Sequence, residues 1–294
     1  MKKINLSIIT LLVIAMSLML ASCTKDGVYK PKKKIAKIYE TVQTDPNPEK
    51  MLKETWTWDG KLLSTIDYGD DDIAHFTYEK KQLKSITIDN SRIDLSYDEK
   101  GKWIDNFKVY YKDDLEATYT FEHGDKNLIS GYTIEYEDGL FDKNSTRLIE
   151  NVFRFLVPEI AIDEAVEYTE VAASPLKGKD KHTVTLTYDG KNVIERVYKR
   201  GELTYTYTYT YTEYRNPFYG LLYTYELDNS LSKNAPATCV RNVAGLPDYN
   251  YTYTYQVDGK VPTQATENMT WSFTAGSTTT THTETITTDY EYTK

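Results

Sequence analysis

The sequence predicts an all-β fold, an antiparallel meander of hairpin repeats that forms a strongly curled or barrel-like sheet. The first observation is composition: 27 of the 294 residues are Tyr, and Tyr and Thr both favour the pleated, half-buried surface of a sheet. The second is the stretch 183–212, where apolar and Thr residues alternate around the turn pair Asp189-Gly190. Alternation on both sides of an Asp-Gly turn is the strongest short-range signal for a β-hairpin.

The third observation is a repeat of about 22 residues. The last aromatic residue before each predicted turn recurs at similar spacing, with 20 residues from Trp58 to Tyr78, 19 from Tyr78 to Tyr97 and 23 from Tyr188 to Tyr211. This length equals two ordinary strands and two turns, so each repeat is one hairpin. The chain then contains roughly a dozen or more strands, and sheets beyond about ten strands curl, split or close.

One stretch departs from the repeat, and one spacing equals two repeats. Tyr211 and Tyr255 are 44 residues apart, which is twice the period. Between Ser145 and Pro158 the apolar residues fall at helical spacing, which predicts one short helix near 146–157. The end of this stretch also alternates as a strand would, so helix and strand both remain open.

The first 22 residues predict a bacterial lipoprotein signal peptide. Lys2 and Lys3 form a basic start, and the apolar stretch 8–20 is shorter than the roughly 20 residues that span a bilayer. The stretch ends in Leu20-Ala21-Ser22-Cys23, which resembles the lipobox of bacterial lipoproteins. The resemblance implies cleavage before Cys23 and attachment of lipid to that residue. The alternative is an ordinary secretory signal with a coincidental Cys.

This assignment divides the chain into a signal peptide (1–22), a tether (23–31) and a β-repeat domain (32–294). Acyl chains on Cys23 would hold the protein on a membrane. We expect an outer-membrane location, and the sequence leaves open whether the protein faces the periplasm or the cell surface.

Charge and cysteine content exclude two classes of protein. The formal net charge is −9 and becomes more negative once the leader lysines are removed, so binding of nucleic acid through its phosphates is not expected. Lipid on Cys23 leaves Cys239 without an intramolecular partner, so we expect no disulfide framework. We predict Cys239 to be a small buried residue.

No set of residues predicts catalysis, a metal site or a cofactor. The four histidines lie far apart in the sequence without the spacing of zinc ligands, and we predict that they lie on the surface. There is neither a phosphate-binding Gly-rich loop nor a nucleophile elbow. A carbohydrate-active enzyme remains the weaker alternative, because glycosidase carboxylate pairs are defined by separation in space.

The aromatic rows are the candidate ligand-binding residues. Tyr205, Tyr207 and Tyr209 point to one face of their strand with Thr on the other, and Trp56 and Trp58 share a face of another strand. Such rows could stack on sugar rings or hold a peptide. The alternative is structural: the Tyr rings fill the inner face of a curled sheet and Thr forms the solvated outer face. A polar outer face argues against a transmembrane barrel, which needs an apolar outer band.

Several of these motifs together resemble one family. They are the lipobox, the serial aromatic-Asp-Gly-Lys-Leu units, the Asn216-Pro217-Phe218 loop and the turn at 258–263. The family comprises uncharacterised β-rich lipoproteins of Bacteroidetes, classed as domains of unknown function. Some have a porin-like sheet, and their hairpins are similar to bacterial YD repeats. The resemblance covers 35–294 and implies a fold and a location.

Three functional hypotheses follow. The first is a non-enzymatic binding module for a glycan or a protein partner in the cell envelope, anchored to the membrane by its lipid. The second is a structural or assembly role in the outer membrane. The third and weaker one is the carbohydrate-active enzyme.

Overall fold

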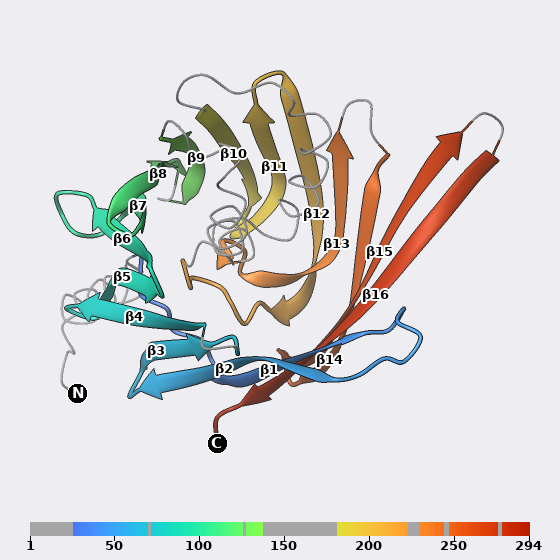
Figure 1. Cartoon of the computed structure of the whole chain (residues 1–294), viewed down its shortest axis with the longest axis horizontal. Coiled ribbons are helices and arrows are strands. Elements are labelled where there is room, and N and C mark those ends of the chain that lie inside the picture. Colours follow the sequence, from blue (N-terminus) through green and yellow to red (C-terminus); the bar gives the residue numbers. More distant parts are fainter. Residues whose placement is uncertain are drawn as a thin grey trace, which may run out of the picture.

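The computed structural model describes residues 26–69, 72–125, 128–137, 181–222, 230–243, 247–275 and 278–294. The described strands are β1 (Ile35–Val42), β2 (Met51–Asp59), β3 (Leu62–Asp67), β4 (Ile73–Glu79), β5 (Gln82–Ile88), β6 (Ser91–Tyr97), β7 (Ile104–Tyr111), β8 (Asp114–His123), β9 (Ile129–Tyr136), β10 (Lys181–Asp189), β11 (Asn192–Arg200), β12 (Leu203–Arg215), β13 (Asn234–Val243), β14 (Tyr249–Asp258), β15 (Val261–Ala275) and β16 (Thr278–Tyr292). They form one closed barrel in which sequence neighbours pair antiparallel and β1 pairs with β16 (Figure 1).

The predicted all-β meander is therefore confirmed, and the sheet closes on itself. The signal peptide (1–22), the lipid attachment site Cys23 and the stretch near 146–157 lie outside the described residues.

Each repeat is one hairpin, as the sequence predicts. The aromatic residues that mark the repeat lie near the ends of even-numbered strands, so their turns all fall at the same end of the barrel. Gly60, Gly190 and Gly259 occupy these turns with φ of 55°, 62° and 64°. Glycine adopts this left-handed conformation without the steric cost that other residues incur.

The 44 residues from Tyr211 to Tyr255 form one repeat and not two. β12 and β14 flank a single strand, β13, and the added length is the connection 216–233. Within its described part, Leu221, Leu222 and Leu231 are buried in the main core. The described residues of this connection therefore pack into the barrel, which the spacing alone does not reveal.

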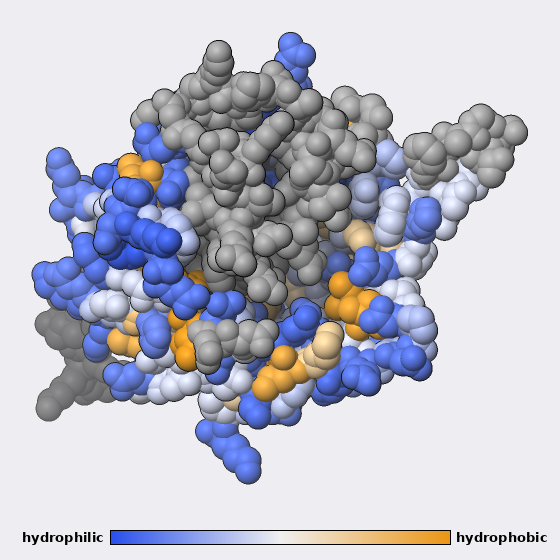
Figure 2. Space-filling view, in the orientation of Figure 1, coloured by the Kyte–Doolittle hydropathy of each residue, from blue (hydrophilic) through white to orange (hydrophobic). Residues whose placement is uncertain are grey.

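On most strands apolar side chains point into the barrel and polar ones point outward, with a few polar exceptions such as Arg241. Ile66, Leu95 and Phe107 are at most 1% exposed, whereas Thr183 and Thr185 on the outer face of β10 are exposed. This is the reverse of a transmembrane barrel, whose outer face carries an apolar band. Figure 2 shows a mainly hydrophilic surface with small, separate hydrophobic patches on the face in view.

The N-terminal segment 26–34 packs across one end of the barrel. Its backbone is hydrogen-bonded to the β6–β7 turn (Asp26 N to Lys102 O, 3.0 Å) and to the start of β5 (Leu83 N to Gly27 O, 2.8 Å). Tyr29 is 5% exposed and donates its hydroxyl to Pro217 O at 2.6 Å.

Two segments far apart in sequence therefore meet across this end, which we call the closed end; the opposite end is the far end. The predicted tether (23–31) overlaps the first segment, and from residue 26 onward it is packed against the barrel.

The hairpin of β15 and β16 extends beyond its neighbours at the far end (Figure 1). β14 pairs with β15 only as far as Trp271, and β1 pairs with β16 only from Ile286 onward. A backbone hydrogen bond from Gln43 N to Thr285 O continues this contact by one residue. The remainder, 272–284, is a two-stranded projection that we call the arm. Its two strands pair with each other, and Ser272 lies opposite Thr281.

Candidate functional site: a cation–aromatic row on the inner wall

The inward-facing side chains of β11 to β16 form a wall that is rich in Tyr. We call it the inner wall. On β14 each Tyr from Tyr249 to Tyr255 is half-buried, and the Thr residues between them are exposed. This alternation places the rings inside and the hydroxyl-bearing Thr outside, as the structural alternative predicts.

One row of the inner wall crosses six neighbouring strands. Its members are directly opposite one another in the ladder, and we call them the cation–aromatic row: Arg196, Tyr207, Arg241, Tyr249, Trp271 and His282. Opposite residues in an antiparallel pair have Cβ atoms about 5 Å apart, so neighbouring side chains of the row are within reach of one another.

The row is held together by cation–π and stacking contacts. The guanidinium carbon of Arg196 lies 4.9 Å from the centroid of the Tyr207 ring, and that of Arg241 lies 4.6 Å from the Tyr249 ring. Trp271 stacks on Tyr249 with centroids 5.6 Å apart and planes at 14°. His282 continues the stack at 5.2 Å and 15°. Both cation–π distances are within the range for attraction, which strengthens when the pair is desolvated.

Burial decreases from Arg241 to His282 along the row. Tyr207 and Arg241 are each 1% exposed, Tyr249 and Trp271 are half-buried, and His282 is exposed. The row therefore begins in the core and ends in solvent at the base of the arm. Its exposed end can accept a ligand ring without any rearrangement of the core.

A small cavity lies beside the buried part of the row. It has a volume of about 40 Å³ and is lined in part by Arg196, Tyr209, Asn216 and Tyr253. A cavity needs roughly 10–15 Å³ to hold a water molecule, so this one holds a few waters and no sugar ring. The cavity is therefore not the ligand site by itself.

Two carboxyl groups lie on the inner face. One raises the pKa of a neighbouring Tyr, and the other has a raised pKa itself. Burial raises the pKa of Tyr253, and the neighbouring Glu267 carboxylate adds to this rise. On β2, burial raises the pKa of Glu54 to about 7. The hydrogen bond from Trp56 lowers this pKa, and the negative charge of Glu40 raises it further. The indole Nε1 of Trp56 donates to Glu54 Oε2 at 2.6 Å.

The predicted Tyr residues lie together on the inner wall. Tyr205 and Tyr207 are 5% and 1% exposed, so their rings belong to the core, while the half-buried Tyr209 lines the cavity. The Trp residues lie elsewhere, on β2. Trp56 is 4% exposed, and Trp58 donates its indole N–H to Ile35 O at 2.7 Å.

The Trp and Tyr groups therefore form two separate clusters, and only the Tyr group adjoins the cation–aromatic row.

The sequence interpretation did not identify Arg196, Arg241 or Trp271. A signal for Arg241 was present, because it falls in phase with the buried residues Cys239 and Val243 of its strand. A charged residue at an inward position of an alternating strand indicates a buried polar contact, because an isolated buried charge is costly. Trp271 carried no such signal, because its contacts with Tyr249 and His282 depend on how three strands align.

The prediction that the histidines lie on the surface is wrong for His182. That ring is 2% exposed, and its Nδ1 lies 2.5 Å from the hydroxyl of Tyr198. Its position on β10 is in phase with the apolar residues, so it packs between the rings of Tyr136 and Tyr198. Cys239 is 5% exposed, which confirms the prediction of a small buried residue.

Two kinds of feature are absent from the described residues. No group of three or more His, Cys, Asp or Glu side chains in these ranges is placed to hold a metal ion. Among the same residues, no helix combines the length and apolar character needed to cross a membrane.

Comparison with known proteins indicates the fold. No family model and no curated protein matches the chain. Among solved structures, a porin-like protein from Bacteroides uniformis ATCC 8492 aligns at a TM-score of 0.52 and 13% identity, over 91% of this chain and 100% of that one. A porin-like protein from Bacteroides vulgatus ATCC 8482 aligns at a TM-score of 0.36 and 13% identity, over 89% of this chain and 99% of that one. The first likeness shows a shared fold.

Proposed function

We propose that this porin-like barrel is a lipid-anchored protein of the outer membrane and a non-enzymatic module that binds a glycan at the exposed end of the cation–aromatic row. The observation that supports this most is the near-parallel stack of Tyr249, Trp271 and His282, which ends in solvent. A sugar ring extends such a stack, because aromatic faces supply apolar contact and the Tyr hydroxyls and imidazole supply polar contact. Buried Arg241 stabilises the stack from behind.

The binding proposal is tested by removing one ring of the stack. Trp271→Ala deletes the central ring, while Trp103→Ala deletes another half-buried Trp that lies at the closed end beside His123. Aromatic contacts are worth about 0.5–1.5 kcal/mol each, so Trp271→Ala weakens binding roughly fivefold.

Titration of intrinsic fluorescence with neutral and acidic oligosaccharides measures both variants. Equal affinity of the Trp271 and Trp103 variants for a bound glycan refutes this placement of the site.

The lipid anchor rests on the lipobox Leu20-Ala21-Ser22-Cys23. Cells fed radiolabelled palmitate should label the wild-type chain and leave Cys23→Ser unlabelled. Protease digestion of intact cells then decides the face of the membrane. Removal of the barrel indicates surface exposure, and survival until the outer membrane is opened indicates the periplasm.

A second candidate, an assembly role with an envelope protein, is favoured by the arm. Among the described residues, the ladder of β1 with β16 ends at Ile286 and one further backbone hydrogen bond joins Gln43 N to Thr285 O. The β16 edge at 280–284 therefore extends beyond β1, and such an edge can add a strand from another protein. Crosslinking in cells should capture a stable complex, which Thr281→Pro should weaken by removing a backbone donor. A chain that stays monomeric in cells argues against this role.

A further inference from the structure

The two ends of the barrel carry opposite charge. At the closed end, the N-terminal segment 26–34 and the described connections between strands contain twelve lysines and four acidic residues: Lys30, Lys32, Lys33, Lys34, Lys61, Lys80, Lys81, Lys100, Lys102, Lys191, Lys233 and Lys260, against Asp26, Asp98, Glu99 and Asp125. The described connections at the far end contain two lysines and eight acidic residues: Lys50 and Lys112, against Asp45, Glu49, Asp72, Asp89, Asp113, Glu137, Glu202 and Asp248.

The hairpin repeat produces this asymmetry. Asp-Gly-Lys occurs at three turns, 59–61, 189–191 and 258–260, and the meander places all three at the closed end. The Asp of each turn is the last residue of its strand, and its carboxylate offsets part of the positive charge of the lysines. One of them, Asp258, forms an ion pair with Lys33, and Lys260 pairs with Glu213 at 2.7 Å.

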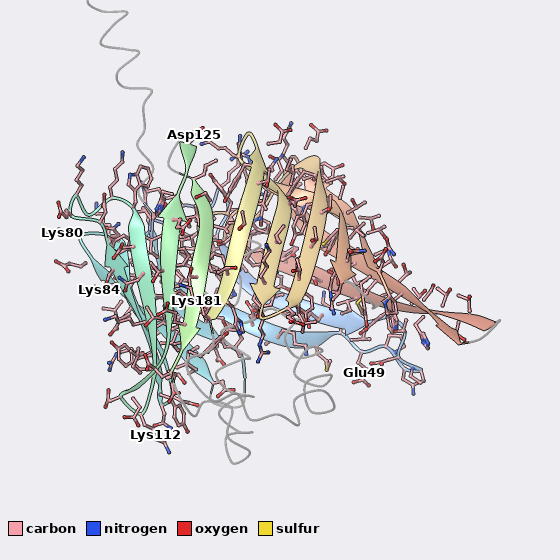
Figure 3. All side chains as sticks on the ribbon, turned by 90° about the horizontal axis from the view of Figure 1, so that it is seen from above. Glu49, Lys80, Lys84, Lys112, Asp125 and Lys181 are labelled. Carbon is pink, nitrogen blue, oxygen red and sulfur yellow. The ribbon has the colours of Figure 1, made fainter. Side chains whose placement is uncertain are left out.

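Other lysines of the closed end are exposed and available. Lys61, Lys80, Lys100 and Lys191 are all exposed. Figure 3 shows Asp125 and Lys112 at opposite ends of the barrel, with Lys80 on the Asp125 side. A chain with a formal charge of −9 thus presents one basic surface.

We propose that this lysine-rich closed end lies against the anionic phospholipids of the membrane in which Cys23 is anchored. Cys23 precedes Asp26 by three residues, which span at most roughly 10 Å. Asp26 is hydrogen-bonded to the closed end itself. The lipid therefore holds the side of the closed end beside Asp26 within about one Debye length of the headgroups, where a lysine is attracted to an anionic surface.

This inference rests on the lipid anchor of the proposed function and adds an orientation to it. A lipid and a basic patch together hold a protein more firmly than either alone. The acidic far end is repelled by the same surface, so the exposed end of the cation–aromatic row and the arm point away from the membrane. In this orientation a glycan or partner reaches His282 without passing the lipid.

The test measures membrane binding without the lipid. The chain from residue 24 onward contains every described contact of the barrel and is mixed with vesicles of phosphatidylcholine alone or with added phosphatidylglycerol. The closed-end variant combines Lys61→Gln, Lys80→Gln, Lys100→Gln and Lys191→Gln. The matched control combines Lys108→Gln, Lys112→Gln, Lys181→Gln and Lys199→Gln, which are exposed, outside the closed end and change the net charge equally.

Phosphatidylglycerol should increase co-flotation of the wild-type chain, and high salt should reverse the increase. Each lysine contributes about fivefold to partition onto an anionic surface, so the closed-end variant should lose roughly several hundredfold and the control little.

The proposal is overturned if phosphatidylglycerol does not change vesicle binding, or if the closed-end variant and the control lose binding equally. Palmitate labelling and glycan titration are read separately, so failure of the orientation is distinct from failure of the anchor or of the binding site.

Discussion

Replacing Glu54 with Gln should stabilise the barrel at neutral pH and leave its stability unchanged in acid. The carboxyl lies on the inner face of β2, half-buried, and accepts a hydrogen bond from Trp56. Gln has nearly the same shape and keeps an oxygen that can accept this bond. The substitution therefore removes the charge while it preserves the packing.

The magnitude follows from the pKa. Burial raises the pKa of Glu54 from 4.5 to about 7 in the folded chain. Below pH 4.5 this carboxyl is protonated in both the folded and the unfolded chain, so it does not lower the free energy of unfolding. As pH rises through 7, the folded chain must bury the charge, and stability falls. The difference between the two pKa values corresponds to about 3 kcal/mol at most, all of it present above pH 7.

Denaturant unfolding of wild type and Glu54→Gln from pH 4 to pH 8 measures this difference. We expect nearly equal free energies of unfolding at pH 4 and a growing advantage for Glu54→Gln up to pH 8. Glu213→Gln is the control: Lys260 lowers the pKa of that exposed carboxyl, so its effect has the opposite sign and is small. A pH-independent difference between wild type and Glu54→Gln would refute the burial argument.

The remaining predictions concern packing. In Gly131→Ala the new Cβ would lie 2.5 Å from the Val184 carbonyl oxygen on the neighbouring strand, so thermal unfolding should show a loss of about 1–3 kcal/mol; an unchanged Tm contradicts this contact. Leu95→Ala should cost about 2–5 kcal/mol because Leu95 is 1% exposed. Leu203→Ala, at a position 43% exposed, should cost well under 1 kcal/mol, and equal losses at the two sites would contradict the assigned core.

Local patterns were sufficient to predict the clearest hairpins. The Asp189-Gly190 turn and the alternation around it depend on neighbouring residues alone, and β10 and β11 form as expected. The Thr residues of β12 and β14 lie outward because strand geometry alternates with a period of two. The same rule placed Tyr205, Tyr207 and Tyr209 on one face, and closure of the sheet made that face the interior.

Contacts between distant residues could not be predicted in this way. Leu221 and Leu231 of the connection between β12 and β13 pack into the barrel because its interior is apolar, and residues from distant strands build that interior. The stack of Trp271 on Tyr249 and His282 depends on the register of three strands. Register is set by the whole sheet, so spacing along the chain does not reveal it.

The most direct test of the binding proposal is the thermal stability of the barrel across a panel of glycans. A ligand that binds only the folded chain raises the free energy of unfolding, by about 2.7 kcal/mol at a hundred times its Kd. We expect at least one glycan to raise the Tm of the wild type and of Trp103→Ala, and to raise that of Trp271→Ala much less. A panel that leaves the wild-type Tm unchanged, or shifts it equally in Trp271→Ala, would contradict a glycan site at the cation–aromatic row.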